Sequence, residues 1–203
     1  LNAHERDGVR YEDAVLTFPV LAKAQTTSLA AWDIPSPVVT VGYAGSPRAY
    51  KGLQTVFESL SSWPEGVRLE LVGGAPAGVH LPPNVTVVPT LPYAELPAKL
   101  ATFHALLLPL DDNLFGRRLT NPLKLWDYLA TGIPIIAADL PTVRDVAGER
   151  PHYYQPGNPK SVVESVVSAL AAGSSEPLLR TWAQRAGEIE TVLAEVLAAR
   201  KPV

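Results

Sequence analysis

The stretch Thr120–Pro141, which reads TNPLKLWDYLATGIPIIAADLP, constrains the fold more than any other part of the chain. It predicts a helix that begins at Pro122 with Asn121 as its N-cap, because proline lacks the N–H that a first helical residue leaves unbonded. Gly132 is placed to end this helix in a left-handed conformation. The apolar run at 133–138 shows no alternation, which is typical of a strand inside a parallel sheet covered on both faces.

This predicted helix has an apolar face and a charged face. Leu123, Trp126 and Ala130 recur at helical spacing and are predicted to be buried. Lys124 and Asp127 lie three residues apart and project together near the helix start, where free N–H groups favour an anion such as phosphate. The spacing fits a plain salt bridge as well as a ligand site, so periodicity alone leaves both open.

Short apolar strands alternate with helices over most of the chain. Strands are predicted at 13–17, 38–43, 69–72, 85–88, 105–110, 133–138 and 152–154. Further helices are predicted near 53–60, 94–102, 159–170 and 177–199, the third of these capped by Asn158. The alternation predicts an α/β fold: a doubly wound, Rossmann-like parallel sheet with helices on both faces. A ligand is expected at the carboxyl ends of the strands.

Composition excludes several classes of function. The 203 residues are 47% hydrophobic and 18% charged, with a formal net charge of −3 and no Lys/Arg-rich run, so nothing favours nucleic acid as a partner. Cysteine is absent, which excludes disulfides and cysteine-ligated metals. No apolar run reaches the roughly 18–20 residues that span a bilayer. We therefore expect no transmembrane segment and a cytoplasmic location.

Two features bear on metal binding. Asp111, Asp112 and Asn113 directly follow the predicted strand 105–110 and form the strongest candidate site. A third acidic position is missing, so we expect no metal there. The four histidines show no ligand spacing, and His104, beside an apolar strand, is predicted to be a core residue with a hydrogen-bond partner.

The segment PLKLWDYLATGIPIIAADLP closely resembles the nucleotide-binding signature of the retaining GT-B glycosyltransferases of family 4, the group 1 transferases. The resemblance places Asp127 on the carboxylate that binds the ribose of the donor, one methylene shorter than the usual glutamate. It places the donor diphosphate at the helix start, formed by Asn121, Pro122, Leu123 and Lys124. One departure is that Leu119 stands where the better-known pattern has a first glutamate, eight residues before the second.

Earlier segments resemble further parts of the same family. Lys51-Gly52 resembles the KG pair whose lysine meets the donor diphosphate, and Arg48 is the candidate for an additional basic residue in that loop. The catalytic residues implied are Lys51 and Asp127. The residues implied near the nucleobase lie after the second and third strands of the domain: Gly73, Gly74, Pro89 and Thr90.

The resemblance covers about 38–197 and implies a domain plan. Residues 1–36 would be a remnant of the N-terminal domain and the linker, 37–175 the Rossmann-like donor-binding domain, and 176–203 a C-terminal helix that packs back toward an N-terminal domain largely missing here. Through that missing domain the protein could also lie peripherally at the inner face of the membrane.

The implied activity is transfer of a hexosyl group, with retention, from a UDP-, GDP- or ADP-linked sugar to an unknown acceptor: a glycan, a lipid or a small molecule. Neither a cofactor nor an obligatory metal is expected, and this chain alone would scarcely turn over. Two alternatives remain: a non-catalytic nucleotide-binding or scaffold module of GT-B type, favoured by Leu119, and a nucleotide-sugar epimerase of GT-B fold.

Overall fold

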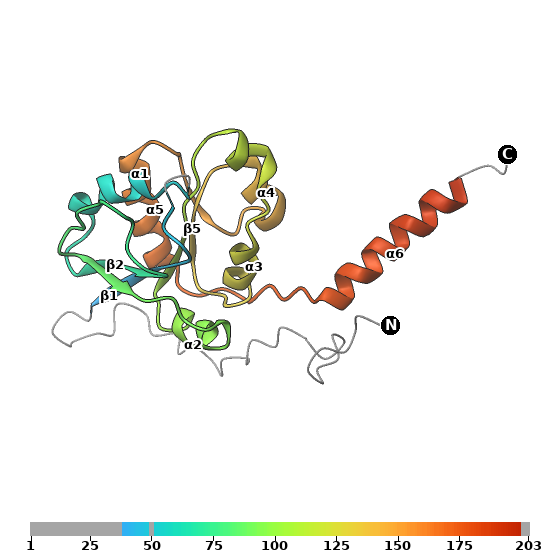
Figure 1. Ribbon diagram of the computed structural model, residues 1–203, viewed down its shortest axis with the longest axis horizontal. Coiled ribbons are helices and arrows are strands. Elements are labelled where there is room, and N and C mark those ends of the chain that lie inside the picture. The colour runs from blue at the N-terminus through green and yellow to red at the C-terminus, as the bar shows by residue number, and fades with distance from the viewer. Residues whose placement is uncertain (1–37, 49–50, 200–203) are drawn as a thin grey trace. The chain divides into compact units, whose positions relative to one another are not determined.

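The computed structural model describes residues 38–48 and 51–199 (Figure 1). Two compact units divide the chain: one spans Leu21–Leu178, and the other combines Leu1–Val20 with Leu179–Val203. The strand predicted at 13–17, the linker and the rest of the predicted 1–36 segment lie outside the described residues.

The first unit contains one sheet of six parallel strands in the order β3-β2-β1-β4-β5-β6. The strands are β1 (Val39–Ala44), β2 (Val67–Val72), β3 (Val85–Val88), β4 (Ala105–Leu108), β5 (Ile135–Ala138) and β6 (His152–Tyr154). Every residue of β4 and β5 is buried, as expected of central strands covered on both faces. The predicted doubly wound, Rossmann-like sheet is confirmed, and its predicted strands appear within a few residues of the expected limits.

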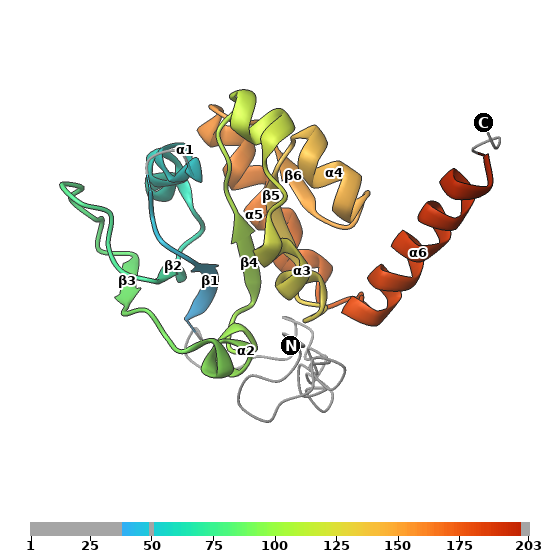
Figure 2. The same ribbon diagram turned by 45° about the vertical axis from the view of Figure 1, so that its right-hand side comes forward.

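Helices cover both faces of the sheet, as Figures 1 and 2 show. They are α1 (Leu53–Ser59), α2 (Leu96–Leu100), α3 (Leu123–Leu129), α4 (Pro141–Ala147) and α5 (Pro159–Ala172), with the short turns η3 (Leu60–Ser62), η4 (Tyr93–Glu95) and the π-helical η5 (Phe115–Leu119). One contacting pair is α1 with α5, and another is α3 with α4. The predicted helix at 94–102 is shorter than expected, because η4 occupies its first part.

The sheet changes direction between β1 and β4. From β1 the chain proceeds outward through β2 and β3, and then returns to the other side of β1 with β4. Only two residue pairs join β1 to β4, but the join is extended by His104, whose Nδ1 accepts the Thr40 N–H at 3.1 Å. The predicted hydrogen-bond partner of His104 is therefore confirmed, but the residue is half-buried rather than a core residue. Such a switch point is where open α/β sheets form a crevice for a ligand.

Helix α3 begins later and buries a different face than predicted. Its N-cap is Pro122, and no side chain caps it, so the prediction that Asn121 is the N-cap is wrong. The buried residues of the helix are Leu125, Tyr128 and Leu129. Leu123, predicted to be buried, is 68% exposed. The segment is apolar at many positions, so helical spacing fits two overlapping faces, and the packing of the sheet selects one of them.

The predicted left-handed conformation of Gly132 is confirmed, although α3 itself ends at Leu129 with Ala130 as its C-cap, and the position requires glycine for a second physical reason. Gly132 has φ +71°, a left-handed conformation that favours glycine. A Cβ on Gly132 would also lie 2.4 Å from the Ser175 carbonyl oxygen, because residues 175–178 pass beneath the end of α3. Ser175 donates its N–H to the Gly132 carbonyl, and Leu178 donates to the Leu129 carbonyl. These contacts fix the C-terminal end of α3.

The two later helices begin at side-chain caps. Asn158 caps α5 by accepting the Ser161 N–H at 3.2 Å, as predicted. In the second unit, α6 (Trp182–Ala199) begins five residues later than the predicted limit of 177, because Thr181 and Gln184 exchange side-chain-to-backbone hydrogen bonds of 2.8 and 3.1 Å. This reciprocal pair is a capping box. Within the described part of the chain, no helix is both long and apolar enough to cross a membrane.

Candidate functional site

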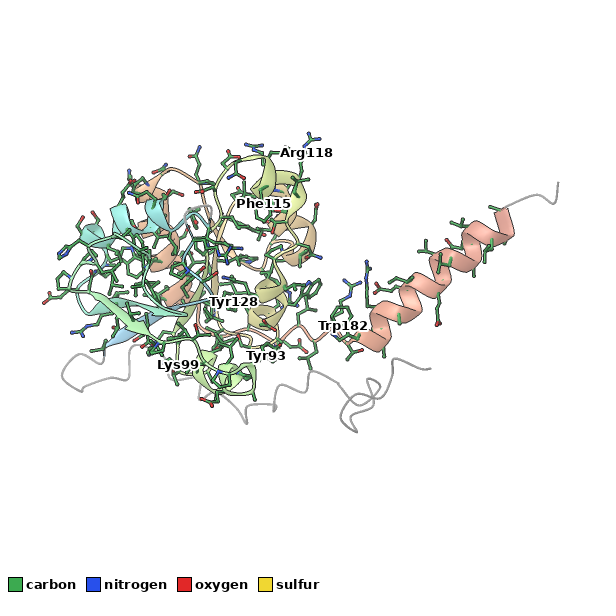
Figure 3. The ribbon with its side chains drawn as sticks, in the orientation of Figure 1. Tyr93, Lys99, Phe115, Arg118, Tyr128 and Trp182 are labelled. Atoms are coloured by element: carbon green, nitrogen blue, oxygen red, sulfur yellow. The ribbon has the colours of Figure 1, made fainter. Side chains whose placement is uncertain are left out.

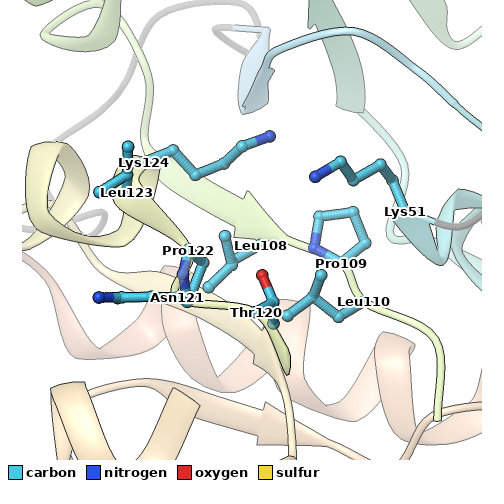
Figure 4. A pocket seen from close by; sticks show the side chains of 9 residues that line it. All are labelled: Lys51, Leu108, Pro109, Leu110, Thr120, Asn121, Pro122, Leu123 and Lys124. Atoms are coloured by element: carbon cyan, nitrogen blue, oxygen red, sulfur yellow. The ribbon is translucent and has the colours of Figure 1, made fainter. Parts of the chain in front are cut away.

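A pocket of about 290 Å³ opens at the carboxyl ends of the strands, where β1 and β4 meet (Figure 4). It lies against the end of β4 and the start of α3. The lining residues are Lys51, Leu108, Pro109, Leu110, Thr120, Asn121, Pro122, Leu123 and Lys124. Figure 4 shows the side chains of Lys51 and Lys124 extending toward one another across the opening. Two lysines from segments far apart in the sequence therefore share one small cavity.

Lys51 is held at the pocket by the glycine that follows it. Gly52 has φ +70° and forms the N-cap of α1. A Cβ on Gly52 would lie 2.5–2.8 Å from backbone atoms of Leu110. The loop can thus approach the end of β4 closely enough to bring Lys51 to the cavity only because residue 52 has no side chain. The Lys51 Nζ lies 5.9 Å from the centre of the Phe115 ring.

Lys124 lies on the first turn of α3 and is largely withdrawn from water. Its Nζ lies 4.1 Å from the centre of the Tyr43 ring, a favourable cation–π arrangement. A Cβ on Gly45 would come within 2.6 Å of that Nζ, so the glycine leaves room for the ammonium group. Burial, and then repulsion from Lys51, lower the pKa of Lys124 to about 7, against the attraction of Asp127.

Tyr128 joins α3 to the end of β1. Its hydroxyl accepts the backbone N–H of Ala44 at 3.0 Å, and both residues are buried. Tyr43, next to Ala44, donates its hydroxyl to the Ser46 carbonyl at 2.9 Å and so holds the turn that follows β1. These two bonds fix the helix that carries Lys124 relative to the strand that leads to Lys51.

We expect Tyr128→Phe to lower the free energy of unfolding by about 1–3 kcal/mol, because the buried Ala44 N–H would lose its acceptor. Urea unfolding would measure this loss. Tyr153→Phe is the matched control, since its hydroxyl bonds the Gly148 carbonyl at an exposed position. Equal losses in the two variants would contradict the role assigned to Tyr128.

Asp127 lies one turn of α3 beyond Lys124. Burial raises the pKa of Asp127, while its hydrogen bond with Tyr93 and the charge of Lys124 oppose the rise. The Tyr93 hydroxyl, from η4, donates to Asp127 Oδ1 at 3.1 Å. The charges of Lys124 and Asp127 act on one another, as their spacing predicts, and Lys124 lines the pocket whereas Asp127 does not.

The structure brings together only some of the other predicted site residues. Pro122, Leu123 and Asn121 line the pocket, although the Asn121 amide points away from the two lysines (Figure 4). Arg48 is exposed in the loop after β1 and is not among the lining residues. Its carbonyl accepts the Lys51 N–H at 2.9 Å, so its backbone shapes the turn.

The residues predicted near the nucleobase fall into two groups. Gly73 and Gly74 follow β2, and a Cβ on Gly73 would lie 2.6 Å from the Gly45 carbonyl oxygen, so this turn contacts the loop after β1. Pro89 and Thr90 are exposed in the loop after β3. None of the four lines the pocket, and their role stays a prediction.

The segment between β4 and α3 carries the predicted departure from the family pattern. Leu119 ends η5 with its side chain 66% exposed, directly before Thr120 of the pocket. Asp112 forms an ion pair with Arg117 in the same segment, and the Asp111 carboxylate accepts the Gly52 N–H. Among the residues that the structure describes, no group of three His, Asp or Glu side chains could hold a metal ion.

Sequence reasoning missed three tyrosines that organise the site. Tyr43, Tyr93 and Tyr128 contact Lys124, Asp127 and Ala44, respectively (Figure 3 labels Tyr93 and Tyr128). The signal for Tyr93 was its position three residues after Thr90, at the end of the loop that the resemblance places near the nucleobase. Local sequence contained no comparable signal for the Tyr128 bond, whose partners are 84 positions apart.

The fold and the pocket at its switch point define the protein as a Rossmann-like α/β domain of the kind found in GT-B enzymes. The chain belongs to the family of glycosyl transferases group 1, whose model matches residues 38–172. No curated protein matches the sequence significantly.

Solved structures share this fold at low sequence identity. Sucrose-phosphate synthase from Thermosynechococcus elongatus matches with a TM-score of 0.62 and 18% identity, over 83% of this chain and 48% of that one. The catalytic domain of cholesterol-α-glucosyltransferase from Helicobacter pylori matches with a TM-score of 0.53 and 15% identity, over 66% of this chain and 87% of that one.

A third match is HepE from Anabaena, solved in complex with UDP-glucose, with a TM-score of 0.54 and 16% identity over 79% of this chain and 49% of that one. This chain therefore spans about half the length of the synthase and of HepE. At these identities the likeness shows the fold alone.

Proposed function

We propose that this chain is the donor-binding half of a retaining glycosyltransferase that takes its sugar from a nucleoside-diphosphate sugar. The observation that carries the proposal is the approach of Lys51 and Lys124 to one pocket at the switch point of the sheet. Family membership supplies the reaction class, and the likeness to HepE, solved with UDP-glucose, supports a nucleotide-sugar donor.

The two lysines suit the chemistry of diphosphate departure. When the bond between sugar and diphosphate breaks, negative charge builds on the leaving oxygens, and fixed cations in a water-poor site stabilise that charge. Lys51, and Lys124 in its protonated form, would do this without an obligatory metal, assisted by the amides of Leu123 and Lys124 at the start of α3. Asp127 would accept hydrogen bonds from the ribose and so orient the donor.

Transfer also needs groups on the acceptor side of the cleft. In the proposed enzyme these come from an N-terminal domain, so the 203-residue chain by itself would bind donor and scarcely transfer its sugar. Transfer is slow when the second reactant is not positioned. A non-catalytic nucleotide-binding module is the second candidate, and the observation that favours it is the exposed Leu119, which offers a donor sugar no hydrogen bond.

Calorimetric titration of the chain with UDP, GDP and ADP tests the proposal. We expect one nucleotide to bind, and Lys51→Ala and Asp127→Ala each to weaken its binding by about 1–3 kcal/mol, as the loss of charged hydrogen bonds does. Lys160→Ala is the control: it removes the same charge as Lys51→Ala but from an exposed position on α5.

Two results would contradict the proposal. One is the absence of binding by all three nucleotides up to about 1 mM, a concentration that corresponds to only about 4 kcal/mol of binding free energy. The other is equal weakening by Lys160→Ala and Lys51→Ala, which would mean that general charge rather than the pocket attracts the nucleotide. If binding is as expected, following the turnover of a nucleotide sugar by the full-length protein, rather than by the 203-residue chain, would separate the enzyme from the non-catalytic module.

A further inference from the structure

The hydrogen bond between Tyr93 and Asp127 links two segments that the proposed function treats separately. Tyr93 belongs to η4, at the end of the loop that leaves β3, and Asp127 belongs to α3. The bond joins the Tyr93 hydroxyl to Asp127 Oδ1 at 3.1 Å. It therefore connects the loop expected near the base of a nucleotide with the carboxylate expected at its ribose.

Two groups compete for the Asp127 carboxylate. Lys124, one turn earlier on α3, attracts it electrostatically, and Tyr93 donates a hydrogen bond to one of its oxygens. Asp127 has one methylene less than a glutamate, so its carboxylate lies close to the helix and reaches a ligand only from a restricted set of rotamers. A partner that holds Oδ1 keeps Oδ2 available in a fixed direction.

The donor and acceptor roles of the pair are unambiguous at neutral pH. Burial, followed by the charge of Asp127 and the hydrogen bond to it, raises the pKa of Tyr93 to about 12, so the phenol keeps its proton. Asp127 can only accept when ionised. Tyr93 is nevertheless 55% exposed, so the bond stabilises the fold little and is accessible to a ligand.

We propose that Tyr93 is a positioning residue for ribose recognition: it holds Asp127 so that the carboxylate selects ribonucleoside over 2′-deoxyribonucleoside diphosphates. This inference rests on the proposed function and extends it to the sugar of the nucleotide. Without the phenol, Asp127 would turn toward Lys124, and its free oxygen would no longer meet the ribose hydroxyls. A site built to bond a hydroxyl rejects the analogue that lacks it, because its polar group is then left unpaired.

Tyr93→Phe tests the proposal, because it removes the hydroxyl and keeps the ring. The probes are UDP, GDP and ADP, each paired with its 2′-deoxy counterpart, and the measurement is calorimetric affinity for the 203-residue chain. We expect the original chain to prefer the ribonucleotide that binds by about tenfold, and Tyr93→Phe to reduce this preference to about twofold, mainly by weakening the ribonucleotide. Tyr153→Phe, which removes a phenol hydroxyl from β6, should leave the preference unchanged.

Asp127→Asn supplies the second arm of the experiment. If Tyr93 acts through Asp127, then Tyr93→Phe should have no further effect on the preference once Asp127 is already replaced. A merely structural role would weaken ribo- and deoxyribonucleotides equally, and would do so in both backgrounds. Urea unfolding of each variant confirms that the comparison is made between folded proteins.

The possible outcomes distinguish a failure of the role proposed for Tyr93 from a failure of the proposed function. If the original chain binds no nucleotide, both fail. If it binds and Tyr93→Phe retains the full preference, or binds the ribonucleotide more tightly than before, Tyr93 does not position the carboxylate and this inference alone is overturned. If the preference falls in Tyr93→Phe and survives in Tyr153→Phe, the inference stands.

Discussion

Lys124→Met is expected to remove nucleoside diphosphate binding and at the same time to make the protein more stable at pH 7. The ammonium group is buried against Tyr43 and repelled by Lys51, which lowers its pKa to about 7. Methionine has a similar length and packs well against an aromatic ring without carrying the charge. We expect the free energy of unfolding to rise by about 1–3 kcal/mol, after allowance for the screening of a partly exposed group.

The gain in unfolding free energy expected for Lys124→Met depends on pH. A lysine in the unfolded chain has a pKa of about 10.4, so between pH 7 and 10 the unfolded state binds more protons than the folded state. The destabilisation caused by the buried Lys124 ammonium is therefore absent above about pH 10 and grows as the pH falls toward 7. Urea unfolding at pH 7, 8 and 9 should show the difference between the original chain and Lys124→Met shrinking as the pH rises.

Lys99→Met is the matched control for this variant. Lys99 (labelled in Figure 3) is also partly buried, and its Nζ lies 5.2 Å from the centre of the Phe103 ring. It differs from Lys124 by its ion pair with Glu70, at 2.5 Å. Removing this lysine leaves a buried carboxylate without its partner, so Lys99→Met should destabilise the fold. A loss of stability in both variants would contradict the account of Lys124.

Gly52→Ala is expected to cost about 2–5 kcal/mol of unfolding free energy. The residue is held at φ +70°, where a side chain costs about 1–2 kcal/mol. Its Cβ would also lie 2.5 Å from the Leu110 carbonyl carbon, and overpacking of this kind costs a further 1–3 kcal/mol or so. Because backbone atoms cannot rotate away as a side chain can, the loop must move. Lys51 moves with it, so nucleotide binding should weaken as well.

Gly66→Ala separates the cost of the left-handed backbone conformation from the cost of the close contact with Leu110. Gly66 has φ +80°, but a Cβ there would meet no atom within 4 Å. It should therefore lose only the conformational part, about 1–2 kcal/mol, and bind nucleotide as before. Urea unfolding and calorimetric titration of the two variants give the comparison. If Gly52→Ala and Gly66→Ala lose the same unfolding free energy, the close approach of the loop to Leu110 does not contribute to the cost.

The fold was predictable because its signals are local. Short apolar strands such as 133–138, glycine turns and the Asn158 cap each specify structure within a few residues; that strand appears at 135–138, and the cap appears as predicted. The shared face of Lys124 and Asp127 was predictable for the same reason, since residues three apart on a helix lie on one face. The start of α6 was misplaced although Thr181 and Gln184 have the spacing of a capping box.

The omissions at the site, and the wrong buried face of α3, concern long-range contacts. The buried face of α3 depends on which side meets the sheet, and Tyr128 decides this by bonding the end of β1. The partner of Asp127 is Tyr93, from a loop 34 positions earlier. The depth of Lys124 depends on Tyr43 and Gly45. None of these pairs follows from periodicity or propensity, because each is made by the closure of the whole sheet.

The join between β1 and β4 has a consequence for how the domain opens. Six residue pairs connect β1 to β2, whereas two connect β1 to β4, so this join, the seam, is the shortest strand pairing in the sheet. Lys51 follows the strand on one side of the seam, and Lys124 follows the strand on the other. An anion held by both lysines would connect the two sides of the seam and raise the free energy of local opening there. The same two lysines that bind the anion would thus also set how often the sheet opens locally at this join.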